Sequence, residues 1–521
     1  MRRAITSSSL YAAITTVTAG SNGRLRIGRV ATAASPFTNR GYARCVQTRL
    51  PAASQKKTTA TITPVDSTLA RMRKAVYGEV ALAVVILAAQ LYLFSRPIHS
   101  ATNYDEDVYL AAVDALRHGQ ALGSDVFAAQ FPGFYDLLRG LSYIAGVSVV
   151  SLRFGFLCVV LLGTVGAWLL GRRFGGRVGG FLAATLLVIA PPLDLFGFQV
   201  IADTPALSLT AFGLGLATCG GVPAAVAAGA VFGAASTVKL TAITAIPALV
   251  WLLRGRLVPA VTGFAVVLCA IVIAHAGAIG DLWSSGVTYH EKARSTSAVI
   301  PHPHRQIFEQ IPRGTPFFVL ALLAVVVTVG FAVKRRPLGV WPLWSWVALS
   351  VLFLLLHKPL HYNHLIDFPF ALAIAAGATL GAATRDVPRV VVGALALALL
   401  AGYVQQLHRV DVAQPPEPTS NIAAAHALAR LTRPGALTVD DRPIVSFLAR
   451  RRVVGQLVDL AYLRWETGSL DDAEVIRDMR RADAVVVSRA LRSRPRIQAY
   501  IRSSYTLRYA AGGVQIFTRS P

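Results

Sequence analysis

The sequence predicts an α-helical polytopic membrane protein with about 11 transmembrane helices, followed by a small C-terminal α/β domain. Hydrophobic residues make up 54% of the 521 residues, and charged residues only 15%. Apolar runs recur between residues 76 and 406, many of them near the length of about 20 residues that a helix needs to cross a bilayer. After Pro415 these runs stop, and short strand and helix patterns alternate.

The first 70 residues stand apart from this membrane pattern. The chain up to Val65 contains no acidic side chain and is rich in Ser, Thr, Ala and Arg. This composition resembles that of a transit peptide, although translated upstream sequence before a start near Met72 would look the same. We expect residues 1–70 to be a disordered or spurious extension, residues 71–410 the transmembrane domain and residues 411–521 an extracytoplasmic α/β domain.

Eleven spans are placed where windows of about 20 residues are mostly apolar. Several of those between residues 178 and 253 are shorter than a full bilayer crossing. The predicted spans are Val76–Phe94, Leu152–Leu170, Val178–Ala190, Ala202–Thr218, Pro223–Ala235, Leu240–Leu253, Leu257–Ala276, Pro316–Val333, Val340–Leu356, Leu365–Ala383 and Val390–Gln406.

Basic residues between the spans predict the orientation. If Arg71–Lys74 lies in the cytoplasm and the spans alternate, basic short loops gather on the cytoplasmic side, as the positive-inside rule requires. This arrangement needs one of the short spans not to be a true crossing. An odd number of spans places the C-terminal domain outside the cytoplasm, at a plasma membrane. The basic loops hold Arg172, Arg173 and Arg177, then Arg254 and Arg256, then Lys334–Arg336, and last Arg385 and Arg389.

Four polar segments are expected on the outer side, although simple alternation does not place all four there. Ionisable residues close to hydrocarbon are costly and are usually retained for function. We therefore look for a site in these segments, which are Ser95–Ser151, Pro191–Asp203, Ile279–Thr315 and His357–His364.

The acids of the first outer segment are the main candidates. Asp105, Glu106 and Asp107 are adjacent, so on a helix they point in different directions, whereas Asp105 and Tyr109 share a face. In a catalytic interpretation, one carboxylate accepts a proton from an acceptor hydroxyl and another supports it, while Asp107 and Tyr109 contact the substrate. In a structural interpretation, Asn103 and Asp105 cap a helix that begins near Glu106.

Two residues at helix ends are open to two interpretations each. Lys239 is the only lysine between Lys74 and Lys292. It is placed to bind a phosphate as a point charge, or to extend its ammonium to the lipid headgroups. Asp203 either caps the helix that follows, with Pro205 behind it, or makes a second acidic contact to sugar hydroxyls.

The last outer segment gathers His357, Lys358, His361, Tyr362 and His364. Its cation and polar rings suit a phosphate headgroup, and Lys358, His361 and Tyr362 are the candidate contacts. A belt of amphipathic side chains at the membrane interface is the alternative. No cysteine or close acid accompanies the histidines, so a zinc site is not favoured, and no metal or other cofactor is assigned.

The C-terminal segment predicts one small core, because about 100 residues suffice for it. Pro415–Pro418 reads as a linker. Helices are expected over Ala423–Leu431, Ile444–Arg450 and Arg496–Ser503, and strands over Ala436–Val439, Ala484–Val487 and Gly513–Phe517.

Composition and motifs argue against several functions. The net charge of +25 falls largely where membrane topology needs it, so nucleic acid is not an expected partner. The sequence has no Walker loop, serine nucleophile elbow or HExxH motif, and so lacks the usual marks of ATP-driven transport and zinc proteolysis. The four cysteines are scattered, without metal or disulfide spacing.

Short motifs follow one another along the chain: the Asp105-Glu106 pair, Ala115–Gly119, Gln130–Tyr135, Leu152–Phe154, Gly233–Lys239, and Pro359–His364 with Pro369 behind it. In this order they resemble the GT-C superfamily of membrane glycosyltransferases. The resemblance covers residues 75–410 and is to bacterial relatives of the protein O-mannosyltransferase and lipid A aminoarabinose transferase group. One departure is Phe131-Pro132-Gly133, where many relatives have Lys-Pro-Pro, so that lysine contact is missing.

The resemblance implies an inverting transfer of a sugar from a polyprenyl-phosphate donor to a glycan, lipid or protein acceptor on the outer face. Asp105 would activate the acceptor, Glu106 would support it, and Lys239 with His361 and Tyr362 would hold the leaving phosphate. It also implies no tightly held metal, whereas oligosaccharyl relatives need one. The alternative is a non-catalytic transporter or flippase, but this chain lacks the mid-membrane ionisable residues and internal repeats expected of one.

Overall fold

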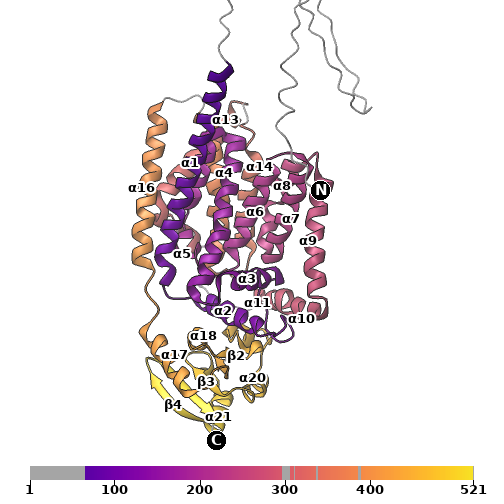
Figure 1. Cartoon of the computed structure of the whole chain (residues 1–521), viewed down its shortest axis with the longest axis vertical. Helices are drawn as coiled ribbons and strands as arrows, with labels where there is room; N and C mark the ends of the chain where they lie inside the picture. Colours follow the sequence, from indigo (N-terminus) through magenta and orange to yellow (C-terminus); the bar gives the residue numbers. More distant parts are fainter. Residues whose placement is uncertain are drawn as a thin grey trace, which may run out of the picture. The chain divides into compact units, whose positions relative to one another are not determined.

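The computed structural model describes residues 65–295, 305–309, 311–335, 338–358, 360–384 and 389–519. Within this part, apolar helices run side by side, and the C-terminal domain lies at one end of them (Figure 1). Residues 1–64 of the predicted extension lie outside the described residues. Residues 65–70 are helical and belong to α1 (Val65–Ser95).

Long helices joined by turns and short helices build the chain up to residue 413. Most lie roughly parallel or antiparallel to α1 in Figure 1. They are α1, α4 (Val149–Val188), α6 (Asp203–Ala217), α7 (Gly221–Val238), α8 (Ile246–Leu253) with the 3-10 helix Leu240–Ala245 before it, α9 (Leu257–Ala274), α13 (Thr315–Val333), α14 (Trp341–Leu356), α15 (Asp367–Ala383) and α16 (Arg389–Ala413).

Seven segments among the described residues are long and apolar enough to cross a membrane. One of them, α4, contains two helices that meet at Gly176, where φ is 66°. Each of the eleven predicted spans overlaps a helix, and α4 holds the second and third. The seven segments are Val76–His99, Val149–Val188, Gly221–Val238, Leu257–Ala274, Pro312–Val333, Tyr362–Ala383 and Val390–Val412.

Small residues let α15 pack closely against α4. An added Cβ at Gly377 would collide with the backbone of Ala183, and one at Gly381 would collide with the backbone of Gly179. Such close approach supplies van der Waals contact between helices in a bilayer, where burial of apolar surface gives little driving force. As a result α15 is the most buried of the seven segments, and it begins at the end where the polar segments meet.

The basic loops lie at the end where α1 begins. Glu79 of α1 forms ion pairs with Arg172 (3.2 Å) and Arg177. Arg256 donates to the carbonyl of Gly221 (3.3 Å). The four polar segments meet at the opposite end, where Asn103 contacts Gln199, His290 contacts Ala129 and Asn363 contacts Asp203.

Short helices lie across the end of the bundle that faces the C-terminal domain. Figure 1 shows α2 and α3 in the space between the long helices and the sheet, with α10 and α11 beside them. These elements are α2 (Tyr104–Arg117), α3 (Pro132–Ala145), α5 (Leu193–Phe196), α10 (Ile279–Trp283) and α11 (Tyr289–Ser295).

The C-terminal domain is a mixed five-stranded sheet in the order β2-β1-β3-β5-β4. Strands β2, β1 and β3 are parallel, and β5 pairs antiparallel with β3 and β4. The strands are β1 (Leu437–Asp440), β2 (Arg452–Val453), β3 (Ala484–Val487), β4 (Tyr505–Ala511) and β5 (Val514–Arg519), and the main helices are α17 (Thr419–Leu431), α18 (Ile444–Leu448), α19 (Tyr462–Glu466), α20 (Asp472–Met479) and α21 (Pro495–Ser504).

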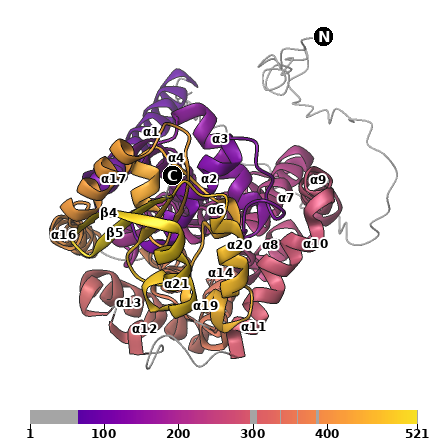
Figure 2. The ribbon, with the colours of Figure 1, turned by 90° about the horizontal axis from the view of Figure 1, so that it is seen from below.

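The domain shares a hydrophobic core with the first outer segment. One cluster of buried residues joins Val108 and Leu116 of α2 to Ala424, Ile444 and Val486 of the domain. Seen from below, β4, β5 and α19 to α21 lie over the end of the bundle (Figure 2). The α/β domain is therefore part of the wall of any site at this end.

Candidate active site

Helix α2 places the three acids in different surroundings. Its N-cap is Asn103, whose side-chain oxygen accepts a hydrogen bond from the backbone N–H of Glu106 (2.9 Å). The amide of Asn103 in turn donates to Gln199 (2.6 Å). The structural interpretation is correct for Asn103, but the helix begins at Tyr104 rather than near Glu106. Because Asn103 supplies the cap, the Asp105 carboxylate is not used for it.

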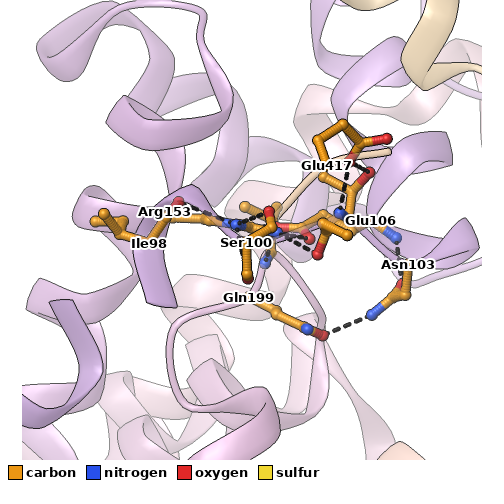
Figure 3. A network of polar contacts seen from close by, with 10 residues as sticks. Ile98, Ser100, Asn103, Glu106, Arg153, Gln199 and Glu417 are labelled. Carbon is orange, nitrogen blue, oxygen red and sulfur yellow. Dashed lines mark hydrogen bonds and ion pairs between the residues drawn. The ribbon is translucent and has the colours of Figure 1, made fainter. Parts of the chain in front are cut away.

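Glu106 is fully buried and forms a bidentate ion pair with Arg153 of α4 (Figure 3). Nε and Nη2 of Arg153 donate to the two carboxylate oxygens at 2.8 and 2.6 Å. The guanidinium also donates to the carbonyls of Ile98, Ser100 and Ala101. Glu106 accepts a further bond from the N–H of Val200 (3.0 Å). This network fixes the turn before α2, so Glu106 holds the position of its neighbour.

Asp105 is accessible to solvent, yet protein surrounds it closely. This desolvation, together with the carboxylates of Asp459 and Asp203, raises the pKa of Asp105 to about 6 against the opposing effect of Lys239. A carboxylate with a pKa close to neutral is well matched to accept a proton from a hydroxyl at physiological pH. Asp105 therefore combines access with the proton affinity that a general base requires.

Asp107 and Tyr109 face the interior. Asp107 is 1% exposed, and burial raises its pKa well above the usual range. Tyr109 is also buried, and its hydroxyl accepts a hydrogen bond from Gln130 (3.0 Å). Its ring packs edge-on against Phe134, with the centroids 4.7 Å apart. Both side chains are therefore enclosed by the protein.

Lys239 and Asp203 form a buried ion pair at the ends of α7 and α6. The second oxygen of Asp203 accepts a hydrogen bond from the amide of Asn363 (3.0 Å). Asp203 does not cap α6, whose N-cap is Ala202, so the capping interpretation is wrong. The snorkelling interpretation of Lys239 is also wrong, because the ammonium points to Asp203 and is 8% exposed. Three polar segments that are distant in the sequence meet here.

Histidine rings border this ion pair. The centroids of His357 and His364 are 4.5 Å apart, and those of His361 and His364 are 5.5 Å apart. Burial lowers the pKa of His357 to about 4, and it also lowers the pKa of His361, with Lys239 adding to the effect on both. The two rings are therefore neutral at pH 7, and their N–H groups can donate to an anion.

Lys358 and Tyr362 occupy the outer part of the cluster. Lys358 is exposed, and the part of the chain that the structure describes supplies no ion pair to it. The ring of Tyr362 lies 5.8 Å from that of Phe196, and the guanidinium of Arg313 lies over it at 5.2 Å. Pro301–His304, part of the outer segment Ile279–Thr315, lies outside the described residues.

The C-terminal domain contributes an acid that sequence reasoning missed. Asp459 is 5% exposed and accepts a hydrogen bond from the hydroxyl of Tyr104 (3.0 Å), next to Asp105. Arg464 donates to the backbone carbonyl of Asp459 (2.6 Å), and its guanidinium lies over the ring of Phe127 at 3.7 Å. The local sequence around Asp459 does not reveal its position, because its contact with Tyr104 joins segments more than 300 residues apart.

Within the described ranges, no group of three His, Cys, Asp or Glu side chains has the arrangement needed to hold a metal ion. The site offers an accessible carboxylate on α2, together with a buried lysine and neutral histidines that come from other segments.

Solved membrane proteins share this fold. ArnT from Cupriavidus metallidurans bound to undecaprenyl phosphate matches with a TM-score of 0.60 and 15% identity, over 86% of this chain and 99% of that one. The oligosaccharyltransferase of Archaeoglobus fulgidus in the apo form matches with a TM-score of 0.51 and 11% identity, over 85% and 74%. AglB from the same organism, in complex with an inhibitory peptide and a dolichol-phosphate, gives a TM-score of 0.51 and 12% identity over the same shares.

No family model and no curated protein sequence matches the chain. The likeness to ArnT and AglB shows that the chain has a GT-C-like fold, a helical membrane domain with a small C-terminal mixed sheet.

Proposed function

We propose that the protein is a membrane glycosyltransferase that moves a sugar from a polyprenyl-phosphate donor to a hydroxyl of an envelope glycan, lipid or protein. The observation that carries the proposal is the position of Asp105: an accessible carboxylate with a pKa of about 6, at the end of a GT-C-like bundle and within electrostatic reach of a buried lysine. ArnT and AglB were each solved with a polyprenyl phosphate, and a donor of that class suits the cationic side of the site.

The proposed reaction is a single displacement. Asp105 removes the proton from the acceptor hydroxyl as its oxygen forms a bond to the anomeric carbon. The bond between that carbon and the phosphate oxygen breaks, with inversion at carbon, and polyprenyl phosphate leaves. Lys239, held by Asp203 and Asn363, stabilises the charge that develops on the phosphate.

Donor contacts are assigned to the last outer segment. His361 and Tyr362 lie at the same end of the bundle as Lys239, and Lys358 is exposed beside them. Neutral imidazoles donate hydrogen bonds to phosphate oxygens without repelling Lys239, which favours their use here. Glu106 supports the reaction indirectly, because the Arg153 network fixes the residue before it in the chain.

We also propose that all eleven predicted spans cross a plasma membrane with the site outside, which sets aside the condition that one short span is not a true crossing. The two halves of α4 and the shorter helices α6, α8 and α14 complete this number. The basic loops lie at the end opposite the C-terminal domain, and basic loops remain in the cytoplasm. This topology places Asp105 and the α/β domain on the extracytoplasmic side.

The test is transfer from radiolabelled polyprenyl-phosphate sugars in membranes that contain equal amounts of wild type or Asp105→Asn protein, with and without EDTA. Asp105→Asn should lower transfer by about 100-fold or more, the usual contribution of a general base. Asp114→Asn makes the same change on α2 at a residue that pairs with His118, and it should leave transfer intact. Equal transfer by wild type and Asp105→Asn would remove Asp105 from the mechanism, and flipping of the donor lipid without transfer would favour a transporter.

A further inference from the structure

A cavity of about 770 Å³ lies where the first outer segment, the region of α10 and α11, and the C-terminal domain meet. We name it the interdomain cleft. Ser124 and Phe127 come from the first segment, Asp281 and Lys292 from the second region, and Gln456 and Arg481 from the C-terminal domain. Its volume falls in the range of about 300–1,000 Å³ typical of binding sites for small molecules.

The walls of the cleft are fixed by direct contacts. The side-chain amide of Gln456 donates to the carbonyls of Gly123 and Ser124 at 2.9 and 2.8 Å. The N–H of Phe127 donates to the carbonyl of Gly455 (3.2 Å). Direct hydrogen bonds therefore hold the C-terminal domain against the first outer segment, and the two form one continuous wall of the cleft.

The inner end of the cleft adjoins the candidate active site. Tyr289 and Phe127 line it, and their rings meet edge-on with the centroids 5.6 Å apart. Arg464 also lines the cleft and donates to the backbone carbonyl of Asp459 (2.6 Å), and Asp459 accepts a hydrogen bond from Tyr104, the neighbour of Asp105. A molecule that fills the cleft thus reaches the neighbourhood of Asp105.

The chemistry of the lining points to a hydroxyl-rich and largely uncharged ligand. Acidic and basic side chains are equally frequent, with four of each, so the cleft has no excess of cations to favour a polyphosphate. Among the described residues, Asp281, Lys292 and Arg481 have no ion pair. Such side chains offer donors and acceptors in equal measure, as sugar hydroxyls require.

Two other occupants fit less well. An acyl chain needs apolar walls, whereas charged, amide and hydroxyl side chains dominate this lining. An extended peptide commonly binds by adding a strand to a sheet edge, but the edge strand nearest the cleft, β2, is two residues long.

We propose that the interdomain cleft binds the sugar chain of a glycan acceptor and that the C-terminal domain is one wall of this acceptor site. The proposal rests on the proposed glycosyltransferase function and narrows its acceptor from glycan, lipid or protein to a glycan of low net charge.

The test measures binding and chemistry separately on purified protein in nanodiscs. Fluorescent neutral hexasaccharides of pentose and hexose sugars are the probes, and a lipid vesicle arm and an unstructured peptide arm are run in parallel. Ser284→Trp places a large side chain in the cleft, and Asp281→Ala removes a free acceptor. Ser503→Trp, an exposed serine of α21 outside the cleft, is the matched control.

Wild type and Ser503→Trp should bind at least one hexasaccharide, and Ser284→Trp should weaken that binding by about tenfold or more, with a smaller loss for Asp281→Ala. Slow hydrolysis of the polyprenyl-phosphate sugar by water, measured without acceptor, should be unchanged in Ser503→Trp and still measurable in the two cleft variants, which shows that they are folded. Absence of hexasaccharide binding by wild type, equal binding by Ser284→Trp, or cleft-dependent binding of vesicles or peptide alone would overturn the proposal.

The two proposals fail in different ways. If hexasaccharides bind in the cleft but no donor is hydrolysed or transferred, the cleft is a glycan-binding site and the proposed glycosyltransferase function is wrong. If the donor is hydrolysed but no hexasaccharide binds, the catalytic function survives and the cleft proposal is wrong.

Discussion

Two buried ion pairs lie at the same end of the bundle, and they use their cations differently. Arg153 satisfies its guanidinium with both oxygens of Glu106 and with three backbone carbonyls. Lys239 has one partner among the described side chains, Asp203. A guanidinium is a rigid fork that suits fixed structure, whereas an ammonium is a point charge with three donors. We therefore expect the Arg153–Glu106 pair to stabilise the fold and the Lys239–Asp203 pair to leave ammonium N–H groups available for a ligand.

The largest expected effect is on catalysis at the second pair. Lys239→Met should lower transfer by about 100- to 1,000-fold, because a preorganised cation near the leaving phosphate is lost. Measured on equal amounts of folded protein, the loss should persist in Lys239→Met combined with Asp203→Asn, which removes the unpaired acid. Lys334→Met, at the opposite end of the bundle, is the control. Recovery of transfer in the double variant would assign Lys239 to structure alone.

The next effect is on stability at the first pair. Arg153→Lys keeps the charge but leaves buried carbonyls of the turn without donors, and each such group costs about 1–3 kcal/mol. We expect a loss of about 3 kcal/mol in the free energy of unfolding, seen as a lower Tm in detergent. The reciprocal change, Lys239→Arg, should alter Tm much less. Equal shifts in Tm for the two swaps would contradict the distinction between the pairs.

The third effect is the pH dependence of transfer. Because the pKa of Asp105 is raised to about 6, its protonation below pH 6 should lower transfer by about tenfold per pH unit. The same shift makes ionisation of Asp105 oppose folding, since the folded state binds the proton more tightly than the unfolded chain does. Asp105→Asn should therefore be as stable as wild type at pH 4 and at least as stable at pH 7. A Tm that falls in Asp105→Asn at pH 7 would contradict the raised pKa.

The smallest effect tests the contribution of the C-terminal domain. The carboxylate of Asp459 raises the pKa of Asp105, so Asp459→Asn should move the acidic limb of the pH profile to lower pH. Tyr104→Phe removes the hydrogen bond to Asp459 and should cost about 1 kcal/mol of stability. Asp472→Asn, in the same domain, is the control, and it should leave the acidic limb of the pH profile unchanged. If the acidic limb of the pH profile of transfer does not move in Asp459→Asn, the C-terminal domain does not influence the pKa of Asp105.

Much of the membrane domain is predictable because its signals are local. The length of the apolar runs predicts where the membrane helices lie. Asn103 predicts the start of α2, because it is a capping residue at the position where that helix begins. The pairing of residues is not local: Asp203 meets Lys239 and Asn363 from two other segments, and Glu106 meets Arg153 across 47 residues. Arg153 lies in the first turn of a predicted apolar span, and a buried cation needs an acidic partner. This pattern could have predicted the pair of Arg153 and Glu106.

Local sequence patterns predicted only part of the C-terminal domain. The predicted strands at β1, β3 and β5 are correct, because buried apolar runs mark them. Strand β4 (Tyr505–Ala511) was missed, since most of its side chains are exposed and it shows no alternation. Strand β2 is only two residues long. Asp459 was missed because nothing in its neighbourhood reveals a contact with α2.

One pairing has a consequence for biogenesis. Ser100 forms a β-bridge with Pro416, and the N–H of Thr102 donates to Glu417 (3.0 Å), so the turn before α2 is completed by residues made some 300 positions later. A ribosome exposes Asp105 early, but its electrostatic surroundings require Asp459. During membrane insertion the nascent chain therefore carries an unfinished candidate site, and the site is complete only when translation has passed the last span and the C-terminal domain has docked.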